Sequence, residues 1–148
     1  MVCCGSEQLE TPETKRKFDV PISMHIDSST GLRIHTATGE LTAADFRAAL
    51  EAVYESPDFE PGKHGLWDLR AAKGAISSEE IDQLASFVGS RWGHLGARKI
   101  ALVVSRDLDF GLARMYEQLL EIQSSIAVMV FRDIEEAKGW LLEADEPV

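Results

Sequence analysis

The chain has 148 residues, the usual size of one domain, and folding at this length buries roughly two thirds of the surface of the unfolded chain. Hydrophobic residues make up 45% and charged residues 27%, as in ordinary globular proteins. A formal net charge of −10 argues against binding to nucleic acids or anionic membranes, which requires clustered basic side chains. There is no apolar run of about 18 residues, so no membrane span is predicted.

The two ends of the chain are polar. Residues 1–20 mix acidic and basic side chains and predict a flexible tail, and the acidic residues 144–148 predict a frayed end, which leaves one domain over 21–143. The tail has no signal-peptide pattern. Cys3 and Cys4 are the only cysteines, too few for a disulfide scaffold or a zinc site. We therefore expect a cytoplasmic protein.

Residues 22–26 and 32–35 alternate apolar with polar side chains and predict a β-hairpin. Gly31 stands where a three-residue loop needs a left-handed residue. A loop of that length sets the register of the two strands. The predicted cross-strand pairs are Ile26 with Ile34, Asp27 with Arg33, and His25 with His35.

Helices and strands alternate through the rest of the chain. Thr42 with Asp45 and Ser77 with Glu80 resemble capping boxes that begin two helices. Gly93 and Gly96 predict the end of the second of these. Apolar segments at 65–69, 99–104 and 125–131 predict strands, and two further helices follow the last two. The order β-β-α-β-α-β-α-β-α predicts an α/β domain with a mixed, mostly parallel five-stranded sheet and about four helices.

The segment Asp109-Phe110-Gly111 spells a signature of protein kinases. A kinase also requires a glycine-rich loop, a strand lysine, a His-Arg-Asp loop and an Ala-Pro-Glu segment, and the sequence contains none of these. We interpret the segment as the start of a helix that Asp107 or Asp109 caps.

No phosphate-binding loop, dinucleotide fingerprint or serine-hydrolase elbow occurs, so no cofactor and no catalytic residue is predicted. His25 and His35 could meet across the hairpin and hold a metal ion. Two ligands make a poor site, because metal sites in proteins have three or four, and we predict none.

Ligands of open α/β sheets bind at the carboxyl ends of the parallel strands, and helix N-termini nearby attract anions. Polar side chains follow these strands and begin the helix after the strand at 65–69. They predict a ligand- or partner-binding patch, with helix capping as the alternative role. Its residues are Asp68, Arg70, Ser77, Ser78, Ser105 and Asp107.

The strand Leu66-Trp67-Asp68-Leu69-Arg70, the turn Ser105-Arg106-Asp107-Leu108 and the helix at 110–116 resemble the STAS / SpoIIAA-like family over residues 20–143. The resemblance implies a β-α superhelical domain related to lipid-carrying SEC14-like modules. Many such domains are regulatory binding partners, including anti-sigma-factor antagonists. In that branch a regulatory serine lies in an Asp-Ser-x-Gly motif. Ile76-Ser77-Ser78-Glu79 has serines in this place without the Asp and the Gly.

These observations favour a non-enzymatic binding or regulatory module that acts through contact with a protein partner or with a second copy of itself. The alternative is a carrier or sensor of a small apolar, lipid-like ligand. A third hypothesis is an enzyme that uses Asp68 with Ser105 or His64.

Overall fold

The expected alternation of strands and helices is present in the computed structural model, which describes residues 22–57, 59–60, 63–93 and 98–143. The tail, both cysteines, Gly96 and residues 144–148 lie outside these ranges. The described elements in chain order are β2 (Ile22–Ile26), β3 (Arg33–Leu41), α2 (Ala43–Tyr54), β4 (Gly65–Gly74), α3 (Ser78–Trp92), β5 (Arg98–Val103), α4 (Asp107–Gln123), β6 (Ile126–Phe131) and α5 (Ile134–Leu142).

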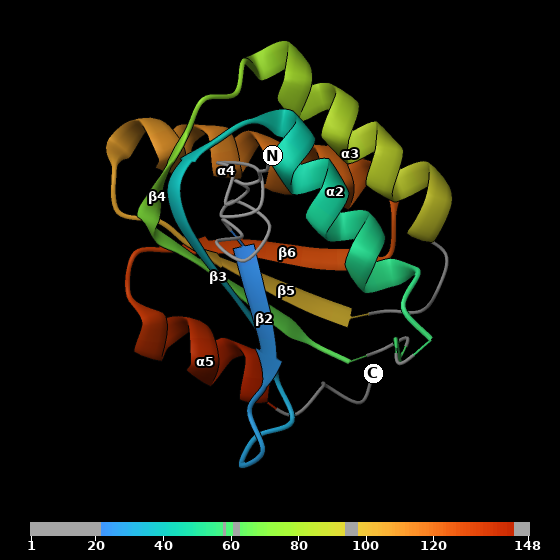
Figure 1. Cartoon of the computed structure of the whole chain (residues 1–148), viewed down its shortest axis with the longest axis vertical. Coiled ribbons are helices and arrows are strands. Elements are labelled where there is room, and N and C mark those ends of the chain that lie inside the picture. Colours follow the sequence, from blue (N-terminus) through green and yellow to red (C-terminus); the bar gives the residue numbers. More distant parts are fainter. Residues whose placement is uncertain (1–21, 58, 61–62, 94–97, 144–148) are drawn as a thin grey trace, which may run out of the picture.

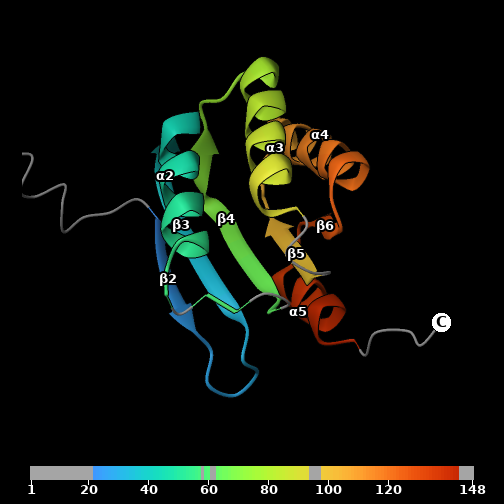
Figure 2. The ribbon, with the colours of Figure 1, turned by 90° about the vertical axis from the view of Figure 1, so that its right-hand side faces the viewer.

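The five strands form one sheet in the order β2-β3-β4-β5-β6. β2 pairs antiparallel with β3, and the other neighbours are parallel. Successive right-handed crossovers that step in one direction place their helices on one face of a sheet. Accordingly α2, α3 and α4 cover one face and α5 lies on the other (Figures 1 and 2). The sheet is mixed and mostly parallel, as the sequence predicts.

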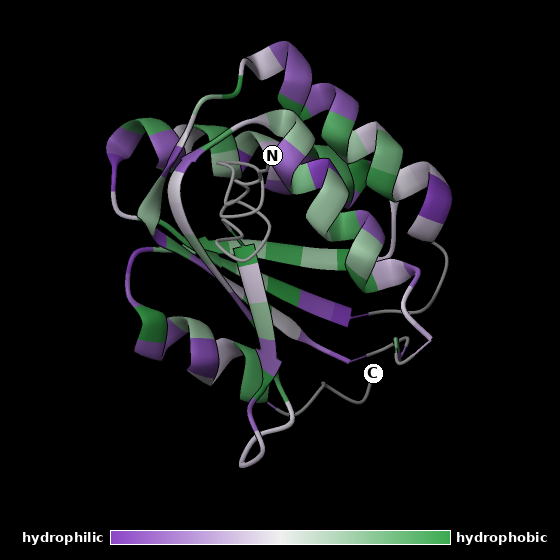
Figure 3. Cartoon of the chain, in the orientation of Figure 1, coloured by the Kyte–Doolittle hydropathy of each residue, from purple (hydrophilic) through white to green (hydrophobic). Residues whose placement is uncertain are grey.

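Two apolar clusters fill the space on either side of this sheet. The larger lies under α2, α3 and α4 and includes Trp67, Val88 and Leu120. The smaller joins α5 to the sheet through Ala137 and Leu141. β6 is hydrophobic along most of its length, whereas α3 alternates between hydrophobic and hydrophilic residues (Figure 3). The alternation in α3 arises because a helix on the surface turns only one stripe of its side chains toward the core. In β6, an edge strand, Ile126, Val128 and Val130 are buried, whereas Ala127 and Met129 are exposed.

The predicted hairpin register is wrong by one residue. Ile26 pairs with Arg33, His25 with Ile34, and Met24 with His35. The cause is Asp27, whose carboxylate accepts hydrogen bonds from the Ser29 backbone and from the Ser29 and Thr30 hydroxyls, so that it belongs to the turn. A shift of one residue reverses the relative faces of two strands, and His25 and His35 therefore lie on opposite faces of the sheet.

The helix starts show where local rules succeed and where they fail. Both predicted capping boxes, Thr42 with Asp45 and Ser77 with Glu80, are confirmed. The predicted aspartate cap of α4 is wrong, because Arg106 is the N-cap residue and makes no side-chain capping bond. Asp109 instead accepts hydrogen bonds from the Arg106 guanidinium and the Gly74 backbone, at 2.9–3.3 Å.

Helix α3 ends at Gly93, as predicted, but the glycine is needed for space. Its φ is −65°, which any residue adopts. A Cβ atom on Gly93 would lie 2.8 Å from the Cβ of Ser124, closer than real Cβ contacts come. The end of α3 therefore packs directly against the chain that follows α4.

Candidate functional site

Four of the six predicted site residues meet where β5 ends beside β4. The Arg70 guanidinium donates to both carboxylate oxygens of Asp68, at 2.8 and 2.9 Å. The Ser105 hydroxyl donates to the backbone carbonyl of Arg70 at 3.0 Å. Arg132, which follows β6, donates to the Ser105 carbonyl and, at 2.7 Å, to the carboxylate of Asp107. These contacts tie three neighbouring strands together.

Ser77 and Ser78 do not join this group in the described structure. The Ser77 hydroxyl accepts a hydrogen bond from the Glu80 backbone, and the Ser77 backbone donates to the Glu80 carboxylate at 2.9 Å. Ser77 is therefore a helix cap, which was the alternative role. Ser78 is exposed in the first turn of α3.

The charged side chains of this strand-end group, formed by Asp68, Arg70, Ser105, Asp107 and Arg132, are paired with one another. The hydrogen bonds from Arg70 hold the pKa of Asp68 below its ordinary value, so the carboxylate stays ionised and occupied. The Ser105 hydroxyl is directed at a carbonyl and has no base beside it. His64 precedes β4, at the opposite end of the strands, where its Nδ1 accepts from the Lys99 backbone. The residues of the enzyme hypothesis are thus separated or engaged in structural bonds.

The described residues contain neither a cluster of metal ligands nor a membrane-spanning helix. Within 22–57, 59–60, 63–93 and 98–143, no three His, Cys, Asp or Glu side chains come together as metal ligands. No helix in those ranges is long and apolar enough to cross a membrane.

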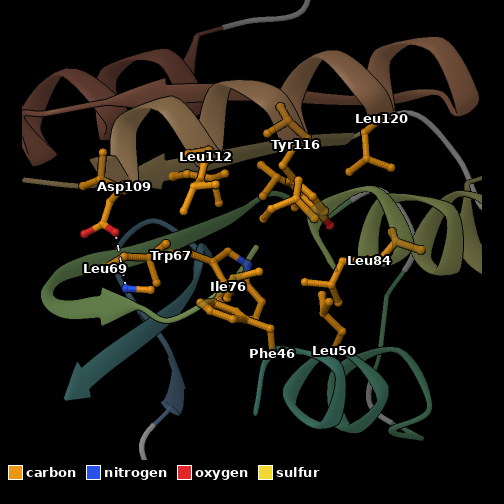
Figure 4. A pocket seen from close by; sticks show the side chains of 18 of the residues that line it. Phe46, Leu50, Trp67, Leu69, Ile76, Leu84, Asp109, Leu112, Tyr116 and Leu120 are labelled. Atoms are coloured by element: carbon orange, nitrogen blue, oxygen red, sulfur yellow. Dashed lines mark hydrogen bonds between the residues drawn. The ribbon is translucent and has the colours of Figure 1, made fainter. Parts of the chain in front are cut away.

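A cavity lies between the sheet and helices α2, α3 and α4, the place that the hypothesis of an apolar-ligand carrier requires (Figure 4). Its volume is about 110 Å³, and apolar side chains from four strands and three helices form nearly all of its wall. Phe46 and Leu50 come from α2, Leu84 from α3, and Leu112 and Leu120 from α4. Each apolar stripe is visible in the sequence, but nothing in the sequence shows that the stripes leave space where they meet.

Two polar groups face this apolar space. The side chains of Trp67 and Tyr116 are directed into the cavity (Figure 4), and neither the indole N–H nor the phenol hydroxyl forms a hydrogen bond with another described residue. Burial raises the pKa of Tyr116 far above its ordinary value, so the hydroxyl keeps its proton. Asp109 closes one end, where its carboxylate is held by Arg106 and Gly74. The cavity thus offers apolar contact and two unused hydrogen-bonding groups.

No protein-family model matches this chain, and neither does any curated protein sequence. A solved structure does match it: an uncharacterised protein of the DUF3478 family with a SpoIIAA-like fold, from Shewanella loihica PV-4. The two share 18% sequence identity, the match covers 81% of this chain and 91% of the other, and the TM-score is 0.52.

The class that the architecture and this likeness define is the SpoIIAA-like α/β fold. The fold implied by the sequence resemblance is therefore confirmed. At this level of identity the likeness concerns the fold alone.

Proposed function

We propose that this protein is a non-enzymatic module that binds a small apolar ligand in the cavity between Trp67 and Tyr116. The observation that carries the proposal is unfilled apolar space in the centre of the larger core cluster. Protein interiors are normally packed as densely as organic crystals, and an empty void of 110 Å³ costs about 2–3 kcal/mol of stability. A ligand that fills it recovers this free energy.

The chemistry of the wall defines the ligand. Apolar cavities of about 150 Å³ stay free of water and take up benzene, so a cavity of about 110 Å³ suits an apolar group of that size or slightly smaller. The hydroxyl of Tyr116 and the indole N–H of Trp67 can each donate one hydrogen bond. The expected ligand therefore combines an apolar body with a single acceptor such as a hydroxyl or carbonyl oxygen.

Benzyl alcohol and toluene test this assignment, because they share a ring and differ in one hydroxyl. We expect both to raise the thermal unfolding temperature of the wild-type protein, benzyl alcohol more than toluene. The Tyr116→Phe variant should lose the advantage of benzyl alcohol and keep its response to toluene.

A variant that fills the cavity provides a second test of ligand binding there. Ala113 lines the cavity from α4, and Ala113→Leu should abolish both responses, whereas Ala48→Leu on the exposed side of α2 should preserve them. Native mass spectrometry of protein purified from its own host should show an added small-molecule mass on the wild type and on the Ala48→Leu control, but not on Ala113→Leu. A clean unliganded mass, together with no response to either probe, would refute the proposal.

A partner-binding surface at the strand ends is the second candidate function. Arg70, Arg106 and Arg132 are 44%, 41% and 48% exposed, and each is held in place by a carboxylate. Guanidinium groups fixed in this way present donors without a large loss of side-chain entropy, as interfaces favour. This surface suits a protein partner or a second copy of the chain.

Charge reversal separates this candidate from the first. Arg70→Glu should abolish capture of a partner, whereas Arg114→Glu, at a paired and equally exposed arginine on α4, should not. Sedimentation velocity on the wild type tests self-association. A monomer whose interactions are unaffected by Arg70→Glu would rule the surface out.

A further inference from the structure

A second hollow lies on the same face of the sheet, between strands β2 and β3 and helix α2. Its volume is about 550 Å³, and it shares no lining residue with the cavity around Tyr116. Met24 and Ile26 of β2 and Val53 of α2 are among its apolar lining residues, and Arg33 and His35 of β3 are among its polar ones. We call this hollow the β2–α2 groove. Met24 and Ile26 are 50% and 49% exposed, although both are large apolar side chains.

The guanidinium of Arg33 is buried and forms no hydrogen bond or ion pair with another described residue. It is only 4% exposed, and its Nη2 atom forms no hydrogen bond. Its guanidinium lies 5.2 Å from the centre of the Phe59 ring. Glu60, the carboxylate that lines the same groove, is bound to Lys63 at 3.2 Å. Buried charges in proteins are normally paired, and among the described residues the Arg33 guanidinium has no carboxylate partner.

His35 supplies a neutral polar group beside Arg33. It is 1% exposed, its Nε2 atom has no hydrogen-bond partner, and its ring stacks on Trp67 at 4.0 Å between centroids. Burial lowers the pKa of His35 to about 3, so the imidazole is uncharged at physiological pH. The groove therefore combines apolar walls with one neutral imidazole and one guanidinium, that of Arg33, which no described carboxylate pairs; its other lining cation, Lys63, is bound to Glu60.

We propose that the β2–α2 groove binds a small organic monoanion: a carboxylate with an apolar body. The planar guanidinium of Arg33 matches the two oxygens of a carboxylate, and the His35 imidazole adds a neutral hydrogen-bonding group beside it. The apolar walls suit an alkyl or aryl body. A phosphate dianion would bring a second negative charge that the groove lining does not balance.

The charges around Arg33 support this choice. Burial lowers the pKa of Arg33, and the nearby Arg98 guanidinium lowers it further, whereas Tyr54 and Glu60 act in the opposite direction. Arg98 donates to the Tyr54 hydroxyl at 2.6 Å. Arg33 is thus a local positive charge in the groove lining, in a chain whose formal net charge is −10. An anion is attracted to this position although the protein as a whole repels it.

Octanoate, 1-octanol and octyl phosphate are probes that share one apolar chain and differ in the head group. Isothermal titration at pH 7.5 should show octanoate binding to the wild type at least about tenfold more tightly than 1-octanol, and more tightly than octyl phosphate. Arg33→Gln should remove the preference for octanoate. Arg47→Gln, at an exposed arginine of α2 that lies over the Phe87 ring, should retain it.

Two more variants test the proposal even if Arg33→Gln does not fold, and separate it from the proposal for the other cavity. Ala52→Trp places a large side chain at the exposed wall of the groove and should abolish octanoate binding even where Arg33→Gln fails to fold. Ala113→Leu fills the other cavity and should leave octanoate binding unchanged, so the two proposals fail separately. Equal affinities for octanoate and 1-octanol, tighter binding of octyl phosphate, or unchanged binding by Arg33→Gln would overturn the proposal.

Discussion

Replacing Arg33 with methionine should make the ligand-free protein more stable. Methionine retains most of the length of the side chain and fills the same apolar surroundings, but it removes the charge. The arginine is 4% exposed, and within the described residues no carboxylate pairs with it. Most substitutions of buried residues destabilise a protein, so an increase in stability would be a specific result.

The expected magnitude follows from two opposing effects. Transfer of a cation from water to the protein interior costs several kcal/mol even after the surroundings relax. The contact between the Arg33 guanidinium and the Phe59 ring, at 5.2 Å, returns about 0.5–2 kcal/mol. We therefore expect Arg33→Met to raise the free energy of unfolding by about 1–3 kcal/mol, which at this chain length raises the melting temperature by about 2–10 °C.

Urea unfolding, followed by tryptophan fluorescence at pH 7.5 without added ligand, measures this difference. The matched control is Arg47→Met, because Arg47 also lies over a phenylalanine ring, at 4.0 Å, but is exposed. The control should change stability by less than about 0.5 kcal/mol. A loss of about 1 kcal/mol or more in Arg33→Met, with the control unchanged, would show that the charge of Arg33 stabilises the fold and would refute the reasoning.

Three further outcomes are expected. Because burial lowers the pKa of His35 to about 3 from an unfolded value near 6.5, the unfolded state takes up the proton first as the pH falls. The free energy of unfolding should therefore fall below about pH 6.5, by roughly 1 kcal/mol between pH 6 and pH 5. In urea titrations at these two pH values, the His35→Gln variant should show a smaller decrease in this free energy than the wild type. Gly93→Ala should destabilise the protein by about 1–3 kcal/mol, because the added Cβ would come too close to Ser124. Gly111→Ala, where a Cβ meets nothing within 4 Å, should stabilise it by about 0.5–1 kcal/mol. Equal effects of the two substitutions in thermal unfolding would contradict the packing argument. Ser77→Ala should cost about 1 kcal/mol in the same assay, because it removes the cap of α3, and no loss would show that the cap is dispensable.

The sequence was most informative where the interactions are local. The caps at Thr42 and Ser77 depend on residues three positions apart, and both formed as predicted. The strand-end group was predictable for a similar reason, since the ends of parallel strands meet at one edge of a sheet. Asp68 and Ser105 were placed there correctly. Ser77 was not, because β4 continues to Gly74 instead of ending near residue 69 as predicted, so α3 begins farther along the sheet.

The hairpin shows that hydrogen bonds within a turn can override a strand register predicted from loop length. Asp27 was expected in the strand opposite Arg33, but its carboxylate binds three donors in the turn. That choice lengthened the loop and shifted every pair by one residue. As a result Met24, and not His25, lies opposite His35 in the β2–α2 groove, and His25 lies on the other face.

The sequence by itself determined the order of strands and helices, both capping boxes, the mixed sheet and the charged edge at the strand ends. Tertiary structure alone decided the hairpin register, the cavity around Tyr116 and the burial of Arg33 without a carboxylate partner among the described residues. The physical reason is the range of the interactions involved. Capping and alternation act between residues a few positions apart, whereas a cavity and an unpaired buried charge arise where elements distant in the chain pack together.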